Sequence, residues 1–225
     1  MASSLDDAAA LFAATRPFVE KQLNQENQIL LFETIGLPVG LWSKAPVKDM
    51  ATVRSLKMRT NNPNTTKTFQ NAKASPTFMS WADVPAALGT GVIDSVVTTG
   101  ESGLVARFYE QLPNYAALNM EIGFWLVHMH KPTFEGLTPD LQKAVLASAA
   151  EARKNAYARV KPRLEDNNKK MKDNGVIVLD PVPAELLQQL AKAGEPLLQE
   201  WKKKVGEETA KKILTTYEAT RPKTK

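Results

Sequence analysis

Residues 55–69, SLKMRTNNPNTTKTF, join a short strand to the start of a helix. The run Leu56-Lys57-Met58 brings Arg59 to the end of the predicted strand, where a polar cluster of Thr, Asn and Pro begins at once. The residues after this cluster predict a helix over 61–74. A strand that leads through a turn into a helix is the repeating unit of α/β proteins.

The same alternation continues along most of the chain. Further helices are predicted over 3–27, 82–91, 101–115, 137–175 and 184–220. Strands are predicted over 28–38, 75–81, 92–100 and 176–183, the first of them as a buried strand, and residues 116–130 form an extended apolar stretch. Residues 41–60 hold a loop, a short turn and the strand around Met58. We therefore assign the chain to the α/β class.

Helix boundaries carry local signals. Ser3 or Ser4 can cap the first helix, and Pro17 starts a new segment or kinks it. In the long helix Thr138 is the cap and Pro139 the first helical residue.

The composition is that of an ordinary globular protein. The chain has 225 residues, of which 43% are hydrophobic and 24% charged, with a formal net charge of +5. Its densest lysine runs, within 167–174 and 200–212, are interleaved with acids, which is typical of solvated helix faces. We therefore predict no nucleic-acid partner.

Cysteine is absent, which excludes disulfides, Cys-zinc sites and thiol catalysis. No run approaches the ~20 apolar residues of a membrane helix. The N-terminal residues carry Asp6 and Asp7 and no basic segment, so they do not predict a signal peptide. Taken literally, the chain would stay in the cytoplasm.

Motifs for catalysis are sparse. His128 and His130 form an H-x-H pair, but the sequence has no further histidine and no cysteine to complete a metal site, so we predict none. Asp94 lies in an apolar run and is expected to accept hydrogen bonds from local amides. A small hydrolase using Asp94 and Glu101 is a lower alternative, because nothing supplies a nucleophile with its base.

Arg59 is the strongest candidate for binding. Arginine offers a planar, permanently charged fork that can hold a carboxylate with two hydrogen bonds. The boundary between a strand and a helix lies at the crevice of an α/β sheet, where ligands bind. A surface arginine or a structural ion pair is the alternative that the residues alone leave open.

The segments VRSLKMRTNN, ASPTFMSWADVPAALGTGVIDS and GLTPDLQKAVLASAAEA, in this order, resemble the DctP family of solute-binding receptors of TRAP transporters. SLKMR corresponds to the family's GLKIR, with Ser55 where the family usually has Gly. The resemblance covers nearly the whole chain from residue 5 on.

The resemblance implies a periplasmic-binding-protein-like (type II) fold of two α/β lobes, with most of the first lobe missing from this N-terminally shortened chain. Residues 1–36 would be a remnant of the first lobe and 37–120 the second lobe with the ligand-binding arginine. Residues 121–172 would form a return segment and a long crossing helix. Residues 173–225 would form a C-terminal strand and helices packing on the second lobe.

The resemblance also implies the function. Such a receptor captures an organic acid in the periplasm and delivers it to TRAP permease subunits in the membrane, without catalysis or a cofactor and without inserting into the membrane itself. Arg59 would pair with the ligand's carboxylate. The acid that pairs with this arginine would then come with the ligand and not from a neighbouring residue in the sequence. Five more residues are expected to line the site: Asn62, Trp81, Thr98, Phe124 and Trp125.

The sequence departs from the family at Pro38 and Val39, where many members have a second arginine, and after Asp94. The identity of the acid is therefore left open. The alternative to a working receptor is a non-functional or misannotated fragment of one.

Overall fold

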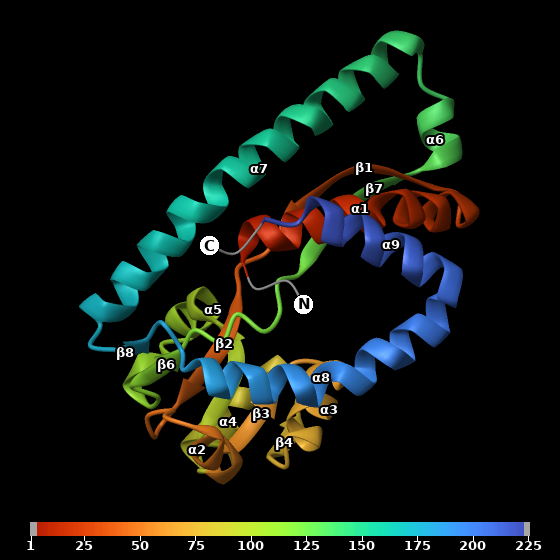
Figure 1. Ribbon diagram of the computed structural model, residues 1–225. Helices are drawn as coiled ribbons and strands as arrows, with labels where there is room; N and C mark the ends of the chain where they lie inside the picture. The colour runs from red at the N-terminus through yellow and green to blue at the C-terminus, as the bar shows by residue number, and fades with distance from the viewer. Residues whose placement is uncertain (1–3, 223–225) are drawn as a thin grey trace. The chain divides into compact units, whose positions relative to one another are not determined.

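The computed structural model describes residues 4–222, which divide into two compact units (Figure 1). Unit 1 consists of Pro38–Glu121 and Glu165–Thr209. Unit 2 consists of the residues up to Leu37, Ile122–Leu164 and the residues from Ala210 on. Within the described part of the chain, no helix is both long and apolar enough to cross a membrane.

Unit 1 is built around a six-stranded mixed sheet with the strand order β4-β3-β5-β2-β6-β8. The strands are β2 (Val39–Ser43), β3 (Lys57–Thr60), β4 (Ser75–Phe78), β5 (Ser95–Thr99), β6 (Asn114–Ala116) and β8 (Ile177–Leu179). β3 is parallel to both β4 and β5, whereas β2 runs antiparallel to β5 and β6. The carboxyl ends of β3, β4 and β5 therefore meet at one edge of the sheet.

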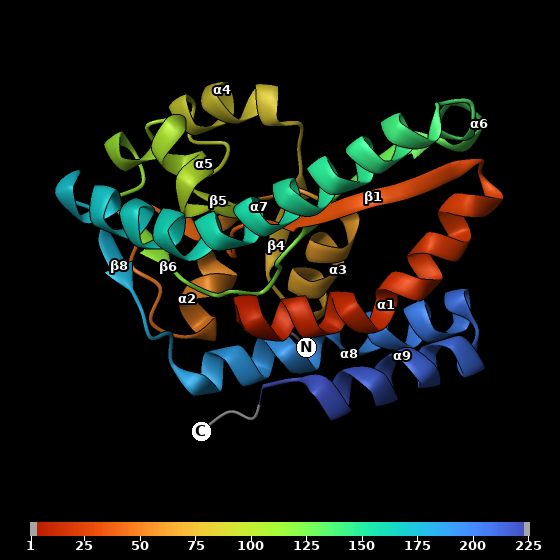
Figure 2. The same cartoon turned by 90° about the horizontal axis from the view of Figure 1, so that it is seen from above.

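Helices cover both faces of this sheet (Figure 2). On one face lie α2 (Met50–Ser55), α3 (Pro63–Asn71) and α8 (Ala184–Val205), whose apolar side chains form a core with Leu41 and Met58. On the other face lie α4 (Val84–Gly89), α5 (Gly100–Val105), the short 3-10 helices η1 (Trp81–Asp83) and η2 (Phe108–Glu110), and the end of α7 (Pro139–Asp173). This second layer packs around Trp42, which is fully buried.

Unit 2 holds a two-stranded antiparallel sheet of β1 (Gln28–Ile35) and β7 (Phe124–His130). Its helices are α1 (Leu5–Gln25), α6 (Lys131–Glu135), α7 (Pro139–Asp173) up to Leu164, and α9 (Glu207–Thr220) from Ala210 on. The hydroxyl of Tyr217 in α9 donates a 2.7 Å hydrogen bond to the carboxylate of Asp7 in α1. This buried contact ties the two helices together.

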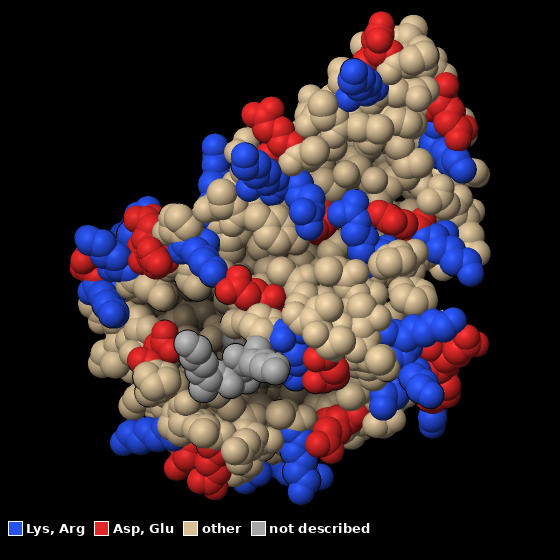
Figure 3. Space-filling view, turned by 45° about the horizontal axis from the view of Figure 1, so that its top comes forward, with Lys and Arg blue, Asp and Glu red and all other residues tan. Residues whose placement is uncertain are grey.

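Most predicted elements are confirmed, including the α/β class, the strand around Met58 and the helix that begins at Pro139. The side chain of Ser4 caps α1, which runs on through Pro17. Ser3, the alternative cap, lies outside the described residues. Charged side chains of both signs are interspersed over the face drawn in Figure 3, as the interleaved lysine runs predict.

Three predictions about individual elements are wrong. Residues 41–43, predicted as the start of a loop, belong to β2. The helix predicted over 101–115 is limited to α5 and η2, and its last two residues belong to β6. β1 is only half-buried, because β7 is its sole strand partner among residues 4–222.

Candidate ligand-binding site

The Arg59 guanidinium lies at the carboxyl edge of the parallel strands of unit 1. Its Nε and Nη2 both donate to the carbonyl oxygen of Met79, directly after β4, at 3.1 and 3.0 Å. Nη1 lies 3.5 Å from the carbonyl oxygen of Val97 in β5. A guanidinium has five N–H donors, so some of its capacity is unused by residues 4–222.

Arg59 is nearly buried, with 5% of its surface exposed. None of the ion pairs found among the described residues includes it. Burial lowers the pKa of the Arg59 guanidinium from its ordinary value, because desolvation penalises its charged form. The site therefore holds a desolvated positive charge whose protein contacts are neutral carbonyl groups.

The Trp81 indole lies beside this charge. The Cζ atom of Arg59 is 5.6 Å from the Trp81 ring centroid, within the range of a cation–π contact. Trp81 also contacts Phe108, with ring centroids 5.6 Å apart and ring planes tilted by 42°. Trp81 keeps 43% of its surface exposed, so the structure brings Arg59 together with an accessible aromatic face.

Asn62 has a structural task at the start of α3. Its Oδ1 accepts a 2.9 Å hydrogen bond from the backbone N–H of Thr65, which is the N-cap interaction. Its Nδ2 donates to Glu121 Oε2 at 2.9 Å, and the Thr65 hydroxyl donates to the same oxygen at 3.1 Å. Both ends of the Asn62 amide are therefore engaged within the protein.

Thr98 is buried on β5, next to Val97, whose carbonyl oxygen faces Arg59. Asn61 immediately precedes the α3 cap, and its Oδ1 is buried without a hydrogen-bond partner in the structure. Sequence reasoning missed Asn61, because nothing in an Asn-Asn pair shows which amide caps the helix. It also missed Met79 and Val97, which act through backbone carbonyls that any residue type would supply.

Phe124 and Trp125 belong to unit 2. Phe124 stacks on Phe12, with ring centroids 4.5 Å apart, and packs against the small core of that unit. Trp125 is 68% exposed. Their contact with a ligand stays a prediction.

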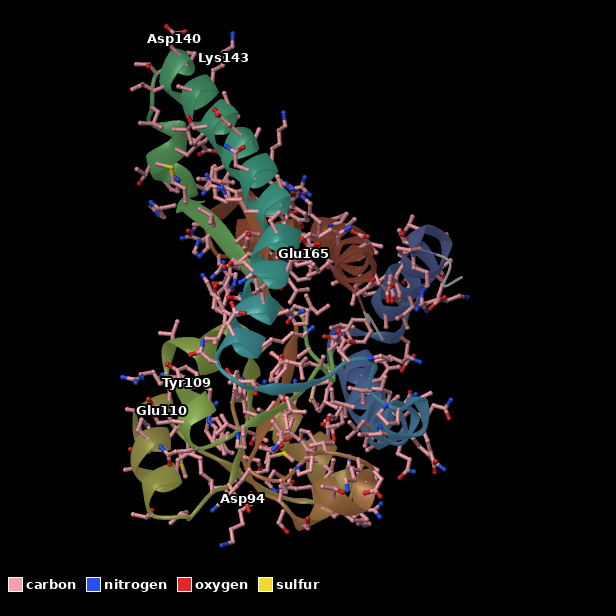
Figure 4. The ribbon with its side chains drawn as sticks, turned by 90° about the vertical axis from the view of Figure 1, so that its left-hand side faces the viewer. Asp94, Tyr109, Glu110, Asp140, Lys143 and Glu165 are labelled. Atoms are coloured by element: carbon pink, nitrogen blue, oxygen red, sulfur yellow. The ribbon has the colours of Figure 1, made fainter. Side chains whose placement is uncertain are left out.

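Asp94 accepts a 2.8 Å hydrogen bond from the backbone N–H of Lys57, as expected of a structural carboxylate. It precedes β5, whereas Glu101 follows that strand, so the backbones of the two acids are separated by a strand roughly 16 Å long at 3.3 Å per residue. Figure 4 shows Asp94 at the edge of unit 1, away from Glu110 and from Tyr109, which lines a groove together with Glu101. The two acids of the hydrolase alternative are thus not brought together.

The histidine pair makes only local contacts. His128 Nδ1 lies 3.0 Å from Gln28 Oε1, and His130 Nδ1 lies 2.9 Å from the Thr133 hydroxyl. Within residues 4–222, no group of three or more His, Cys, Asp or Glu side chains could hold a metal ion.

A groove of about 320 Å³ lies elsewhere on unit 1, between α5, η2 and the end of α7. Its lining includes Glu101, Tyr109 and Lys170, and Asn167 at its floor is buried, with Nδ2 3.5 Å from Glu101 Oε1. None of the predicted ligand-binding residues lines it.

Comparison with known proteins identifies the class to which this α/β protein belongs. Residues 16–204 match the family of bacterial extracellular solute-binding proteins, family 7, known as DctP. The chain belongs to this family, whose members are periplasmic-binding-protein-like solute receptors and not enzymes.

Three similar proteins illustrate the relationship. The 2,3-diketo-L-gulonate-binding periplasmic protein YiaO of Escherichia coli K12 is 36% identical over 141 residues, 61% of this chain and 42% of YiaO. A solute-binding protein of Sulfitobacter sp. NAS-14.1 is 30% identical over 68% of this chain and 46% of its own length. The solved structure of DctP7, a Bordetella pertussis extracytoplasmic solute receptor binding pyroglutamic acid, is 26% identical with a TM-score of 0.87, covering 97% of this chain and 72% of DctP7.

The match therefore spans less than half the length of YiaO and less than half the length of the Sulfitobacter protein. The resemblance found in the sequence is confirmed, and so is the fold class that it implies.

Proposed function

We propose that this protein is the solute receptor of a TRAP-type transporter, that it works in the periplasm, and that it captures an organic acid through the carboxylate. The captured acid is delivered to membrane permease subunits for import driven by an ion gradient. The observation that carries this proposal is the nearly buried Arg59, whose only acceptors among residues 4–222 are backbone carbonyls.

The chemistry of the proposed contact follows from this environment. A carboxylate supplies the negative charge that no described residue provides to Arg59, and it accepts from N–H groups that the Met79 and Val97 carbonyls leave unused. Charge-assisted bonds of this kind are about twice as strong as neutral ones. The carbonyl contacts fix the guanidinium plane in advance, so little side-chain freedom is lost on binding.

Two more residues of unit 1 belong to the proposed site. The exposed face of Trp81 can cover an apolar portion of the ligand. The Thr98 hydroxyl can donate or accept one hydrogen bond. Asn62 supports the site by fixing the start of α3.

The similar proteins support an acid as the ligand. DctP7 binds pyroglutamic acid and YiaO is named for 2,3-diketo-L-gulonate, and both compounds carry a carboxylate. At 26% and 36% identity the exact ligand does not transfer to this chain.

A thermal-shift screen of the purified protein against organic acids tests the proposal. An acid that binds only the native state raises the melting temperature, by the equivalent of about 2.7 kcal/mol at a concentration 100 times Kd. We expect a shift with at least one acid, and at least a hundredfold loss of affinity in Arg59→Ala, which corresponds to about 2.7 kcal/mol. Arg59→Lys should also bind poorly, because lysine cannot supply the fork.

Arg54→Ala is the matched control. Arg54 also donates to a backbone carbonyl, that of Ala72 at 2.9 Å, but it lies on the exposed side of α2. The control variant should keep the wild-type shift. Equal affinity in wild type and Arg59→Ala would contradict the proposed site.

A further inference from the structure

The side-chain oxygen of Asn61 is in an unusual environment for a buried polar atom. Its Oδ1 is the one buried side-chain nitrogen or oxygen that has no hydrogen-bond partner within residues 4–222. Folded proteins satisfy nearly all such atoms, because an unpaired buried acceptor has lost its water without compensation. A group that stays unpaired in the ligand-free protein is therefore a candidate for pairing with a ligand.

The position of Asn61 relates this atom to Arg59. Asn61 directly follows β3 and precedes the α3 cap, so it stands two residues after Arg59 at the carboxyl end of the strand. Between them, the Thr60 hydroxyl lies 2.7 Å from that of Thr66 in α3. Asn61 and Arg59 therefore both lie where β3 passes into α3.

We propose that Asn61 Oδ1 makes this protein select acids that carry a neutral N–H or O–H donor near their carboxylate. This inference rests on the proposed function and names the ligand class for the same site. Lactam acids and 2-hydroxy acids are members of that class. The carboxylate pairs with Arg59, and the donor pairs with Asn61.

The Asn61 amide and the Arg59 guanidinium both favour a neutral donor. The amide oxygen of Asn61 carries no net charge, so it offers little compensation for desolvating a cation. The guanidinium two residues away would also repel a positively charged donor. Asn62 cannot take the role of Asn61, because its own amide is engaged by Thr65 and Glu121.

The first test needs no ligand. In Asn61→Leu, a side chain of similar shape replaces the unpaired acceptor with an apolar group. We expect the melting temperature of the ligand-free protein to rise by about 3 °C. Asn64→Leu, the same substitution at an exposed position of α3, is the control and should change it by less than about 1 °C.

The second test uses a matched pair of probes. L-pyroglutamate has a ring N–H where its lactone analogue, 5-oxotetrahydrofuran-2-carboxylate, has an oxygen of similar size. Wild type should bind the lactam at least about tenfold more tightly than the lactone by isothermal titration calorimetry. Asn61→Leu should reduce this ratio to about one, and Asn64→Leu should keep it.

Several results would overturn the inference. If the two probes, or succinate without any donor, bind wild type equally well in an Arg59-dependent way, acid capture stands and selection by Asn61 fails. A lower melting temperature in ligand-free Asn61→Leu would show that the oxygen has a structural partner. If no acid binds wild type at all, the proposed function fails together with the inference.

Discussion

At the scale of single residues, Glu33 of unit 2 carries a buried negative charge that its neighbours must compensate. Its carboxylate is fully buried in β1 and accepts from Arg16 at 3.0 Å, from Arg153 Nε at 2.7 Å and from the Tyr157 hydroxyl at 3.1 Å. These partners come from α1 and α7. The buried charge is compensated only while both helices are in place, so it links their positions to that of β1.

The same cluster predicts how stability depends on pH. Burial, reinforced by the charge of Glu33, raises the pKa of the Tyr157 hydroxyl to about 12, whereas an unfolded tyrosine titrates near 10. The folded state therefore holds this proton more tightly than the unfolded state. The resulting stability is fully present below about pH 10 and is lost as the pH rises toward about 12.

Urea denaturation of wild type and Tyr157→Phe at pH 9, 10 and 11 measures this effect. We expect wild type to lose more of its free energy of unfolding between pH 9 and 11 than the variant, which has no proton to lose at this position. Burial also raises the pKa of Tyr115 and Tyr217, so the variant should still lose part of its free energy of unfolding between pH 9 and 11. An identical loss in both proteins would contradict the assignment.

Sequence reasoning identified Arg59 but not Asn61, and the difference has a physical cause. An arginine between a strand and the start of a helix places a planar, permanently charged guanidinium there, and few structural roles require such a group. Asn61 and Asn62 are chemically the same, and only the path of the chain decides which caps α3 and which keeps an unpaired oxygen. Roles assigned by backbone geometry do not show in a one-dimensional pattern.

At the scale of elements, α5 lies so close to β2 that one residue must lack a side chain. Trp42 in β2 is fully buried, and its indole N–H donates to the Thr99 carbonyl at 3.2 Å, just before α5. A Cβ atom at Gly103 would overlap the Trp42 indole. Gly103 is therefore required by close approach, because its neighbour is a rigid ring in a packed core.

Gly103→Ala should lower the free energy of unfolding by about 1–3 kcal/mol through overpacking, as measured by urea denaturation. Gly194→Ala is the matched control, since it lies in α8 with no atom within 4 Å of the added Cβ. That substitution should be neutral or stabilising by up to about 1 kcal/mol. Equal effects in the two variants would show that the contact with Trp42 can relax.

The elements that the sequence failed to predict share one property. β2 and β6 are short strands of five and three residues, and both are fully buried. Burial on both faces removes the alternation of apolar and polar residues that reveals a strand. α7, with 35 residues and signals at its start, was predicted almost to the residue, because its pattern is local and long.

At the scale of the whole molecule, the two units differ in the core that supports them. Unit 1 packs sixteen buried residues on one face of its sheet and eleven on the other. The apolar cluster beside the sheet of unit 2 has three buried residues, and that sheet has two strands. A two-stranded sheet is marginally stable unless other elements pack on it.

Native-state hydrogen exchange should reveal this difference within one sample. We expect amides of β1 and β7 to exchange at least about a hundredfold faster than those of β2 and β5, since local opening costs less where less apolar surface is buried. Glu33 acts against this opening, because exposing β1 separates its carboxylate from Arg16 and Arg153. Mass spectrometry of peptides covering 28–35 and 39–43 compares the two sheets directly. Equal protection of these peptides would mean that the buried ion pairs of Glu33 stabilise unit 2 as strongly as the larger apolar core stabilises unit 1.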